Sequence, residues 1–192
     1  MNKIFCLVGP SGAGKDTIKK AVGLPYIISY RTRPKRKNEK EGIDGYFISV
    51  KQFKEFDKLN LWIAKTEYPE GSGNYYGITA AELEPLKDSP LLYVVDYTGV
   101  ITLKESLRNT KEFSSEQVIS IFIHSDEIEL VNRMIDQGRD TKEIEKRIKQ
   151  FTDDLKVANQ CDYIVKNKQG QFESTLNDIY RIILKETFPV HN

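Results

Sequence analysis

The segment Gly9-Pro-Ser-Gly-Ala-Gly-Lys-Asp-Thr17 directly follows a short apolar run, Ile4–Val8. The run is rich in β-branched and aromatic residues, which predicts a buried strand. The three glycines allow the next residues to curl so that backbone N–H groups converge, and a helix predicted at 16–22 points its positive dipole end at the same place. Strand, glycine-rich turn and helix together predict a P-loop that holds the phosphates of ATP, with Lys15 at the β- and γ-phosphates. The expected ATP-binding residues of this loop are Gly9, Pro10, Ser11, Gly12, Ala13, Gly14, Lys15, Asp16 and Thr17.

The residue after the lysine departs from the usual P-loop pattern. This position is normally Ser or Thr, whose hydroxyl binds the Mg²⁺ that bridges the nucleotide phosphates, but here it is Asp16. A carboxylate can bind Mg²⁺ directly or through water, or it can simply stabilise the N-terminus of the helix. Both interpretations stay open, and Thr17 offers a substitute hydroxyl.

Length and charge limit the classes of function. A chain of 192 residues can form one core, alone or with small inserted lobes. Its formal net charge of +1 creates no overall field that would draw it to a nucleic acid polymer or an anionic membrane. Cys6 and Cys161 do not make a disulfide framework or a metal cluster. No secretory signal is evident and no apolar run approaches the ~18 residues of a membrane span, so we expect a soluble cytoplasmic protein.

Short, mixed elements are predicted up to about residue 80. They comprise strands at 26–30, 46–48 and 61–67, a helix at 50–59, and a loop at 69–77 that carries Tyr75 and Tyr76. Because the later chain alternates regular strands and helices, we expect the block at about 29–80 to be an inserted lobe.

A basic run, Arg31-Thr-Arg-Pro-Lys-Arg-Lys37, begins where the first strand of this block is predicted to end. Such runs are usually solvated faces or nucleic-acid patches. Here the run follows a strand end in a phosphate-binding fold, and the planar fork of arginine suits phosphate oxygens. We therefore expect it to bind a second phosphate.

The later elements complete a parallel α/β sheet. Strands are predicted at 91–95, 118–123 and 163–165, with helices at 126–135, from 141 onward, and at 172–184. Asp96 follows the first of these strands and would lie at the carboxyl edge of the sheet, where an acid can hold a Mg²⁺-bound water. Its alternative role is that of a solvent-facing loop acid.

Three arginines, Arg133, Arg139 and Arg147, fall in a helical and polar region at about 125–150. On a mobile segment above bound ATP they could stabilise charge on a transferring phosphoryl group. The alternative is that they are ordinary surface arginines.

Nearly the whole chain resembles the guanylate kinases, a family of P-loop nucleoside monophosphate kinases. The motifs that carry the resemblance are the P-loop at 9–15, Ser-Tyr-Arg-Thr-Arg-Pro-Lys-Arg at 29–36, Gly-Ile-Asp-Gly-Tyr-Phe-Ile-Ser at 42–49, Gly-Asn-Tyr-Tyr-Gly at 73–77 and Asp-Tyr-Thr-Gly at 96–99. The resemblance implies one kinase domain over 1–192, with a parallel-sheet P-loop NTPase core, a monophosphate-binding lobe at about 29–80 and a helical lid at about 125–150.

The resemblance also implies site roles. The acceptor would be held by Ser29, Arg33, Arg36, Tyr46, Tyr76 and Asp96, and Asn167 would lie near the adenine of ATP. The catalytic residues would be Lys15, Arg33, Arg133, Arg139 and Arg147. Asp16, Thr17 and Asp96 are the candidate ligands of Mg²⁺.

The chain departs from the family around the base of the acceptor. Ala64, Ile78 and Val94 stand where the family has polar guanine contacts, although Thr66, Glu67 and Thr79 lie nearby. One family tyrosine that touches the acceptor phosphate aligns with Gly45, and the neighbouring Tyr46 could replace it.

These features predict transfer of the γ-phosphoryl group of Mg·ATP to a nucleoside monophosphate, with GMP or dGMP as the expected acceptor and the protein acting as a monomer or homodimer. Two alternatives keep the chemistry but change the acceptor: another or modified deoxynucleoside monophosphate, or ribose 1,5-bisphosphate. An alternative of another class is a non-catalytic, guanylate-kinase-like interaction module. The intact P-loop lysine argues against that module, because a scaffold needs no working donor site.

Overall fold

The computed structural model describes residues 1–188, except for the side chain of Gln150. At its centre four parallel strands form a sheet in the order β6-β1-β7-β8. The strands are β1 (Ile4–Val8), β6 (Leu91–Val94), β7 (Val118–His124) and β8 (Tyr163–Lys166). Because all four run in one direction, their carboxyl ends meet at a single edge of the sheet, where α/β folds bind ligands.

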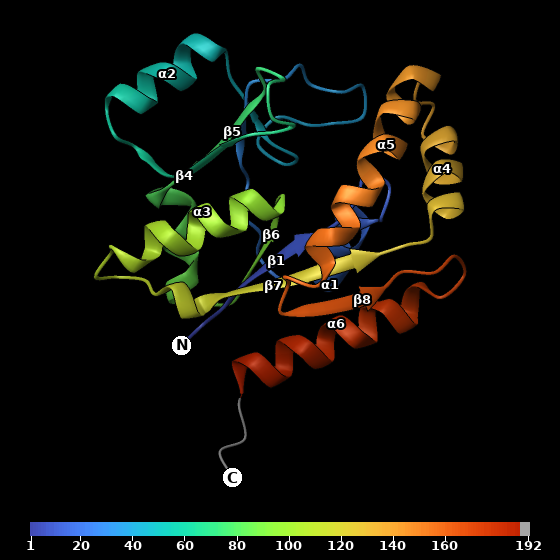
Figure 1. Ribbon diagram of the computed structural model, residues 1–192. Helices are drawn as coiled ribbons and strands as arrows, with labels where there is room; N and C mark the ends of the chain where they lie inside the picture. The colour runs from blue at the N-terminus through green and yellow to red at the C-terminus, as the bar shows by residue number, and fades with distance from the viewer. Residues whose placement is uncertain (189–192) are drawn as a thin grey trace.

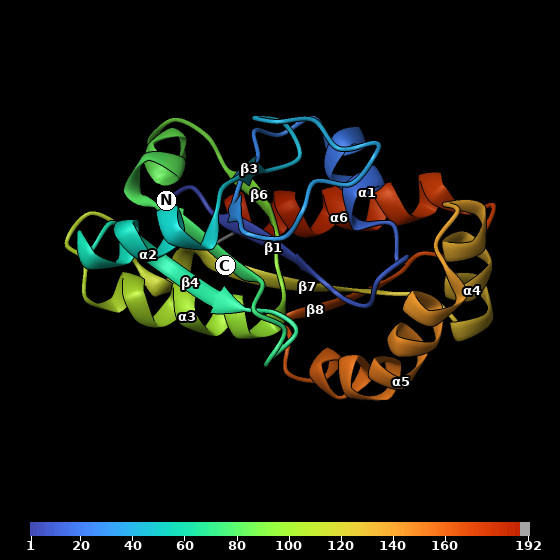
Figure 2. The same cartoon turned by 90° about the horizontal axis from the view of Figure 1, so that it is seen from above.

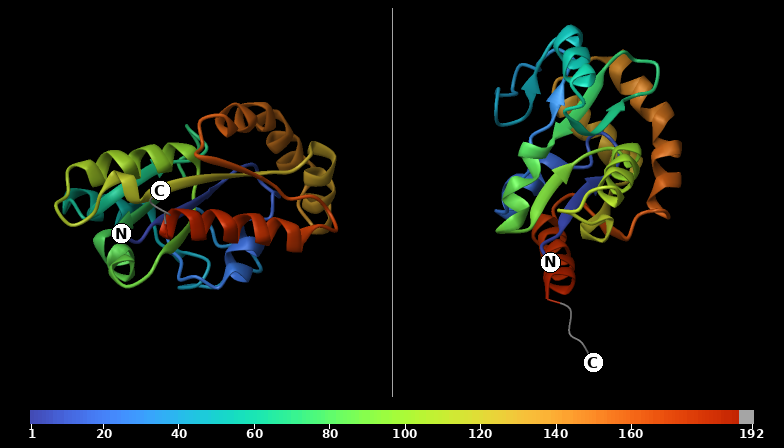
Figure 3. Two further views of the ribbon diagram at one scale, coloured as in Figure 1. Left: turned by 90° about the horizontal axis from the view of Figure 1, so that it is seen from below. Right: turned by 90° about the vertical axis from the view of Figure 1, so that its left-hand side faces the viewer.

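Helices cover both faces of this sheet (Figures 2 and 3). Along β1, Ile4 and Cys6 pack into one hydrophobic core, whereas Phe5 and Leu7 pack into a second core on the other face. The helices beside the sheet are α1 (Lys15–Val22) and α6 (Phe172–Thr187) on one face, and α3 (Tyr97–Arg108) with the C-terminal end of α5 (Thr141–Ala158) on the other. Burial on both faces explains why β1 is apolar throughout.

A second, separate sheet has the order β3-β2-β5-β4 and lies above the first sheet in Figure 1. Its strands are β2 (Tyr30–Arg31), β3 (Tyr46–Phe47), β4 (Trp62–Glu67) and β5 (Tyr75–Thr79). β2 pairs in parallel with β3, while β5 runs antiparallel to both β2 and β4. Helix α2 (Val50–Lys58) begins with a capping box, in which Ser49 and Gln52 bond each other's backbone N–H groups.

The remaining elements connect these two sheets and form a helical pair. Helices α4 (Glu127–Asp136) and α5 lie side by side at the right of Figure 1. Two 3₁₀ segments, Ala80–Lys87 and Ser115–Gln117, precede β6 and β7. No helix within residues 1–188 combines the length and apolar character needed to cross a bilayer.

Two elements in and around the second sheet differ from those predicted. Residues 26–30 are not one strand: Tyr26 forms an isolated bridge to Leu92 of β6, and only Tyr30 belongs to β2. The loop predicted at 69–77 ends early, since Tyr75 and Tyr76 lie on β5. In both cases strand formation depends on pairing with residues far away in the sequence, so local composition predicts it poorly.

Helix α3 was not predicted, although its sequence contains a helix-capping residue and apolar residues at helical spacing. Asp96 caps its first turn by accepting a hydrogen bond from the Gly99 N–H, and Val100, Leu103 and Leu107 follow at spacings of three and four. These three side chains are buried against the first core and anchor the second sheet to it.

We expect Leu103→Ala to lower the free energy of unfolding by about 3 kcal/mol, because it leaves a cavity between α3 and the sheet. Leu103 is 0% exposed, whereas Ile101 on the same helix is 42% exposed. The control Ile101→Ala should therefore change stability by less than about 0.5 kcal/mol. Urea unfolding curves measure both values, and equal losses in the two variants would contradict this packing.

Candidate active site

The P-loop emerges from the carboxyl end of β1 and runs directly into α1. Gly9 has φ 138°, and a Cβ there would lie 2.5 Å from the Ile123 carbonyl oxygen on the neighbouring strand. Gly14 has φ 89°, and its Cβ would lie 2.5 Å from the Asn167 side-chain nitrogen. Glycine at these positions therefore satisfies both a left-handed backbone and a lack of space. The N-cap residue of α1 is Gly14, which has no side chain to cap the first N–H groups, so these groups suit anion binding.

Lys15 is folded back onto its own loop. Its Nζ donates hydrogen bonds to the carbonyl oxygens of Gly9 at 2.6 Å and Pro10 at 2.8 Å. Burial lowers the pKa of Lys15 to about 8, although the carboxylates of Asp16 and Asp154 oppose this shift. Within the described part of the chain, the ammonium group of Lys15 donates to these two neutral oxygens alone.

The connection between β8 and α6 is hydrogen-bonded to the P-loop. Asn167 is buried, donates from its side-chain nitrogen to the Ala13 carbonyl at 2.8 Å and accepts from the Thr175 hydroxyl at 3.3 Å. Arg133 donates to the carbonyl oxygens of Asn167 at 3.0 Å and Gly12 at 3.4 Å. Asn167 and Arg133 thus bind the P-loop backbone, while the catalytic role of Arg133 and a contact of Asn167 with adenine stay predictions.

The helical pair α4 and α5 brings further arginines to the loop. Arg139 donates to the Ser11 hydroxyl at 2.7 Å and pairs with Glu143 at 3.3 Å. Arg147 is close enough for its charge to act on both Lys15 and Asp154 of α5. The three predicted lid arginines are therefore all gathered near the P-loop.

A polar face of the second sheet forms the opposite side of the candidate site. Tyr76 on β5 is flanked by Arg31 on β2 and by Thr66 on β4. Alternation along the chain directs Ser29 and Arg33 to the same side as Arg31. We call these five residues the polar face of the second sheet.

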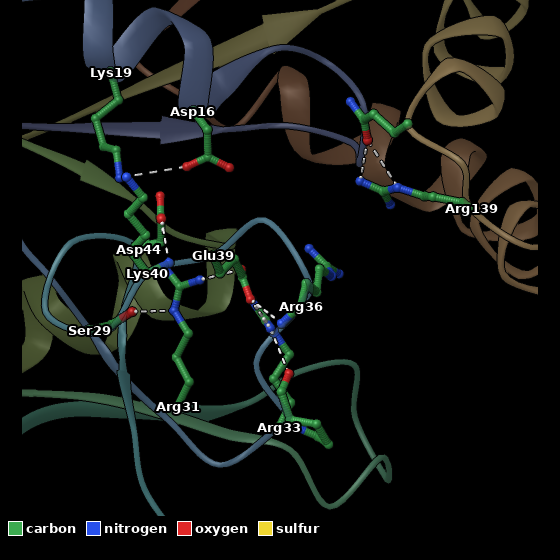
Figure 4. A network of polar contacts seen from close by, with 12 residues as sticks. Asp16, Lys19, Ser29, Arg31, Arg33, Arg36, Glu39, Lys40, Asp44 and Arg139 are labelled. Atoms are coloured by element: carbon green, nitrogen blue, oxygen red, sulfur yellow. Dashed lines mark hydrogen bonds and ion pairs between the residues drawn. The ribbon is translucent and has the colours of Figure 1, made fainter.

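Glu39 binds the arginines of this face, as Figure 4 shows. Arg33 donates to both of its carboxylate oxygens, one bond measuring 2.7 Å, and the backbone N–H of Arg36 adds a third bond at 2.8 Å. Arg31 approaches one oxygen at 3.5 Å. Although burial acts in the opposite sense, the bonds from Arg33 and Arg36 lower the pKa of Glu39 to about 2.

Arg36 links the second sheet to the helical pair. Its guanidinium lies 3.8 Å from Glu143 of α5, the residue that also binds Arg139. Burial, followed by the charge of Arg36, lowers the pKa of Arg139. Arginines from two separate parts of the chain thus converge on one carboxylate.

Tyr46 does not join the polar face. Its ring centroid lies 4.8 Å from that of Tyr30, within an aromatic cluster on the other side of the second sheet that also contains Phe56 and Trp62. The strand pairing of Tyr46 with Tyr30 imposes this position. The prediction that Tyr46 replaces a phosphate-binding tyrosine is therefore not supported by its geometry.

The apolar residues at the expected base pocket are packed rather than open. Ala64 and Ile78 pair across β4 and β5 and are buried in the core that contains Leu103. Val94 at the end of β6 packs against the core on the other face. The side chains at these three positions offer no hydrogen bond to a base.

Of the nearby polar alternatives, Thr66 alone reaches Asp96. Its hydroxyl donates to Asp96 Oδ2 at 3.4 Å, whereas Glu67 accepts from the Gly73 N–H and Thr79 is bonded to Glu82. Burial raises the pKa of Asp96, although its hydrogen bond from Gly99 acts in the opposite sense. Asp96 therefore lies at the carboxyl edge of the sheet, as predicted, and also caps α3.

A cavity of about 120 Å³ joins these parts of the site. Its lining includes Gly9 of the P-loop, Asp96 of the sheet edge, Tyr68 and Asp154 of α5. Burial raises the pKa of Asp154, and the nearby Lys15 opposes that shift. Asp154 was missed in the sequence because nothing in its local pattern distinguishes it from the other acids of an amphipathic helix.

The candidate metal ligands differ in accessibility. Asp16 is exposed in the first turn of α1, with Lys19 3.6 Å away, and Thr17 is exposed beside it. Both Asp96 carboxylate oxygens already accept hydrogen bonds. No three His, Cys, Asp or Glu side chains within the described chain are grouped as a metal site. Asp16 and Thr17 fit an ion whose other ligands are phosphate oxygens and water.

Comparison with known proteins gives consistent similarities. The family model described as guanylate kinase matches residues 1–186. The chain is 32% identical over 192 residues to a guanylate kinase of Rickettsia felis, covering 95% of this chain and 93% of the relative. It is 33% identical over 197 residues to a guanylate kinase of Mesomycoplasma hyopneumoniae, covering 97% and 96%. The crystal structure of guanylate kinase from Anaplasma phagocytophilum superimposes with a TM-score of 0.71 at 25% identity, covering 99% and 97%.

We expect affinity for ATP to fall as the pH rises through about 8, the pKa of Lys15 in the free protein. Bound phosphates favour the ammonium form, so above that pH binding must take up a proton and the affinity falls by up to about tenfold per pH unit. Isothermal titration between about pH 7 and 9.5 measures this slope. Lys15→Arg is the control, because guanidinium does not titrate in this range. An equal slope in both proteins would contradict the assignment to Lys15.

Proposed function

The chain belongs to the guanylate kinase family, and on that premise we propose that it phosphorylates GMP or dGMP. As a member of this family it is an ATP-dependent nucleoside monophosphate kinase. The observation that best supports the proposal is the convergence of three cationic groups on one place: Lys15 of the P-loop, Arg36 beside the polar face and Arg139 of the helical pair.

On the donor side, Lys15 would leave the Gly9 and Pro10 carbonyls and bind the β- and γ-phosphates. The backbone N–H groups at the start of α1 would bind the same phosphates. Arg139, which lies on Ser11, and Arg147, which lies close enough to influence Lys15, would stabilise charge on the transferring phosphoryl group.

On the acceptor side, Arg33, Arg36 and Tyr76 would orient the phosphate of the nucleoside monophosphate. The attacking oxygen of a phosphate monoester is already charged, so the transfer needs no strong general base. Positioning and electrostatic stabilisation then supply most of the catalysis. Closure of the lobe and the lid would exclude water and so limit hydrolysis of ATP.

We propose Mg²⁺ as the ion bound with ATP. Asp16 and Thr17 are the accessible side chains that would hold it, directly or through water. Held there, Mg²⁺ would supply positive charge that offsets the negative charge developing on the donor phosphates. Asp96 is less suited to direct binding, because it is partly buried and caps α3, whereas Asp16 and Thr17 are exposed.

Asp96 is better suited to binding the acceptor. Together with Ser29 and Thr66 it supplies polar groups beside a region in which Ala64 and Ile78 supply none. A partly buried carboxylate can accept hydrogen bonds from the N–H groups of a base, and an acceptor that lacks these groups would leave the carboxylate unpaired.

The first test is the release of ADP from Mg·ATP in the presence of single acceptors. The panel is GMP, dGMP, AMP, dTMP, dUMP, CMP and ribose 1,5-bisphosphate, and Lys15→Ala is the blank. We expect GMP or dGMP to be turned over with the highest kcat/KM. Preference for another acceptor would replace the proposed substrate, and inactivity on the whole panel would favour the interaction module.

We further expect Asp96→Asn to raise the KM for GMP by about tenfold or more, because one charged hydrogen bond is lost. Asparagine caps a helix about as well as aspartate, so the free energy of unfolding should change by less than about 0.5 kcal/mol. Steady-state kinetics and urea unfolding measure the two effects. If the requirement for Mg²⁺ rose and the KM for GMP stayed constant, Asp96 would act on the metal instead.

A further inference from the structure

Arg31 occupies the centre of the polar face, although the predicted acceptor site did not include it. Strand pairing places it directly opposite Tyr76. Its neighbours at alternate positions of the chain, Ser29 and Arg33, lie on the same side. Arg31 is thus surrounded by three residues that the proposed function assigns to the acceptor.

The side chain of Arg31 is held in place before any ligand binds. Its Nε donates to the Ser29 hydroxyl at 3.2 Å, and its Nη1 lies 3.5 Å from Glu39. Only 15% of the side chain is exposed. An arginine fixed in this way loses little further freedom when its fork binds a phosphate.

Gly45 provides the space that Arg31 fills. A Cβ at Gly45 would lie 2.8 Å from Arg31 Nε and 2.9 Å from its Cδ. The φ angle of Gly45 is not positive, so its backbone conformation does not require glycine. The lack of a side chain at Gly45 is therefore explained by the position of Arg31.

Charge balance distinguishes Arg31 from Arg33. Arg33 and Glu39 form a two-bond ion pair, which is neutral as a unit. Among the residues that the structure describes, Arg31 adds a positive charge that pairs with the same carboxylate alone, in one contact at 3.5 Å. Burial, and after it the charge of Arg33, lower the pKa of Arg31, whereas the hydrogen bond to Glu39 raises the pKa of Arg33 against the effect of burial. The excess positive charge of this cluster therefore comes from Arg31.

We propose that Arg31 binds the phosphate of the acceptor, with its guanidinium N–H groups donating to the non-bridging oxygens beside those bound by Arg33. Glu39 stays in place as the counter-charge of Arg33, and Gly45 is the residue that makes this position of Arg31 attainable. The proposal deepens the proposed function, on which it rests, by adding a binding residue. This arrangement also favours acceptors whose phosphate is fully ionised. Glu39 neutralises the charge of Arg33, so Arg31 supplies the positive charge that remains for the phosphate.

The main test compares Arg31→Thr with wild type. We expect the KM for the acceptor to rise about 10- to 100-fold, as loss of one or two charged hydrogen bonds implies. The KM for ATP should change by less than about twofold. Arg181→Thr is the matched control, because Arg181 is 81% exposed and pairs with Asp178 on the surface of α6. A lower melting temperature with an unchanged KM would overturn the proposal in favour of a purely structural arginine.

A double-mutant cycle tests the role of Gly45. We expect Gly45→Ala to raise the KM for the acceptor in wild type, because the new Cβ displaces the Arg31 guanidinium. In the Arg31→Thr background the same change should have little further effect. Additive effects of the two substitutions would show that Gly45 acts independently of Arg31 and would overturn this part of the proposal.

A binding experiment separates this proposal from the proposed function. Phosphorus NMR of inorganic phosphate is recorded with Lys15→Ala, which weakens the competing P-loop site, and with the double variant Lys15→Ala/Arg31→Thr. We expect line broadening by the first protein and its loss in the second, whether or not any nucleotide is turned over. Equal broadening by both would show that Arg31 does not bind phosphate, even if GMP proves to be the substrate.

Discussion

Repulsion between cations is the constraint on which this site depends. The P-loop, the second sheet and the helical pair each bring lysine or arginine to one region, and like charges in a partly buried site repel strongly. Carboxylates at fixed positions offset this repulsion. Glu39 binds Arg33, Glu143 binds Arg139 and approaches Arg36, and Asp154 acts on Lys15. The acids of the site are therefore as necessary to its assembly as the arginines that would bind phosphate.

The two faces of the second sheet carry different kinds of side chain. One face carries an aromatic cluster, in which the rings of Trp62 and Phe53 stack at 4.3 Å and Tyr30 packs edge-on at 5.5 Å from Trp62. This packing stabilises a small sheet that has little core of its own. The other face is free to carry Arg31 and Tyr76. Tyr46 lies on the aromatic face because it is paired with Tyr30, and paired residues of neighbouring strands share a face of the sheet.

Most of the parts that depend on local sequence could be predicted, although α3 was missed, whereas the exact pairing within the second sheet could not. The P-loop, the parallel sheet and the guanylate kinase family are confirmed, because a glycine-rich turn between an apolar run and a helix is a local pattern. The position of Tyr75 on a strand and the place of Tyr46 follow from partners far away in the chain. The division into core, lobe and lid, and the role of each site residue, stay predictions.

Trp62 gives the protein a built-in optical probe of one half of the site. It is the single tryptophan of the chain, and its ring lies against Gly77, where a Cβ would come within 2.7 Å of it. Gly77 is the strand neighbour of Tyr76 on the polar face, whereas the P-loop lies across the site on the other sheet. Fluorescence excited selectively at tryptophan therefore samples the second sheet rather than the P-loop, so a change at this sheet can be followed without any label.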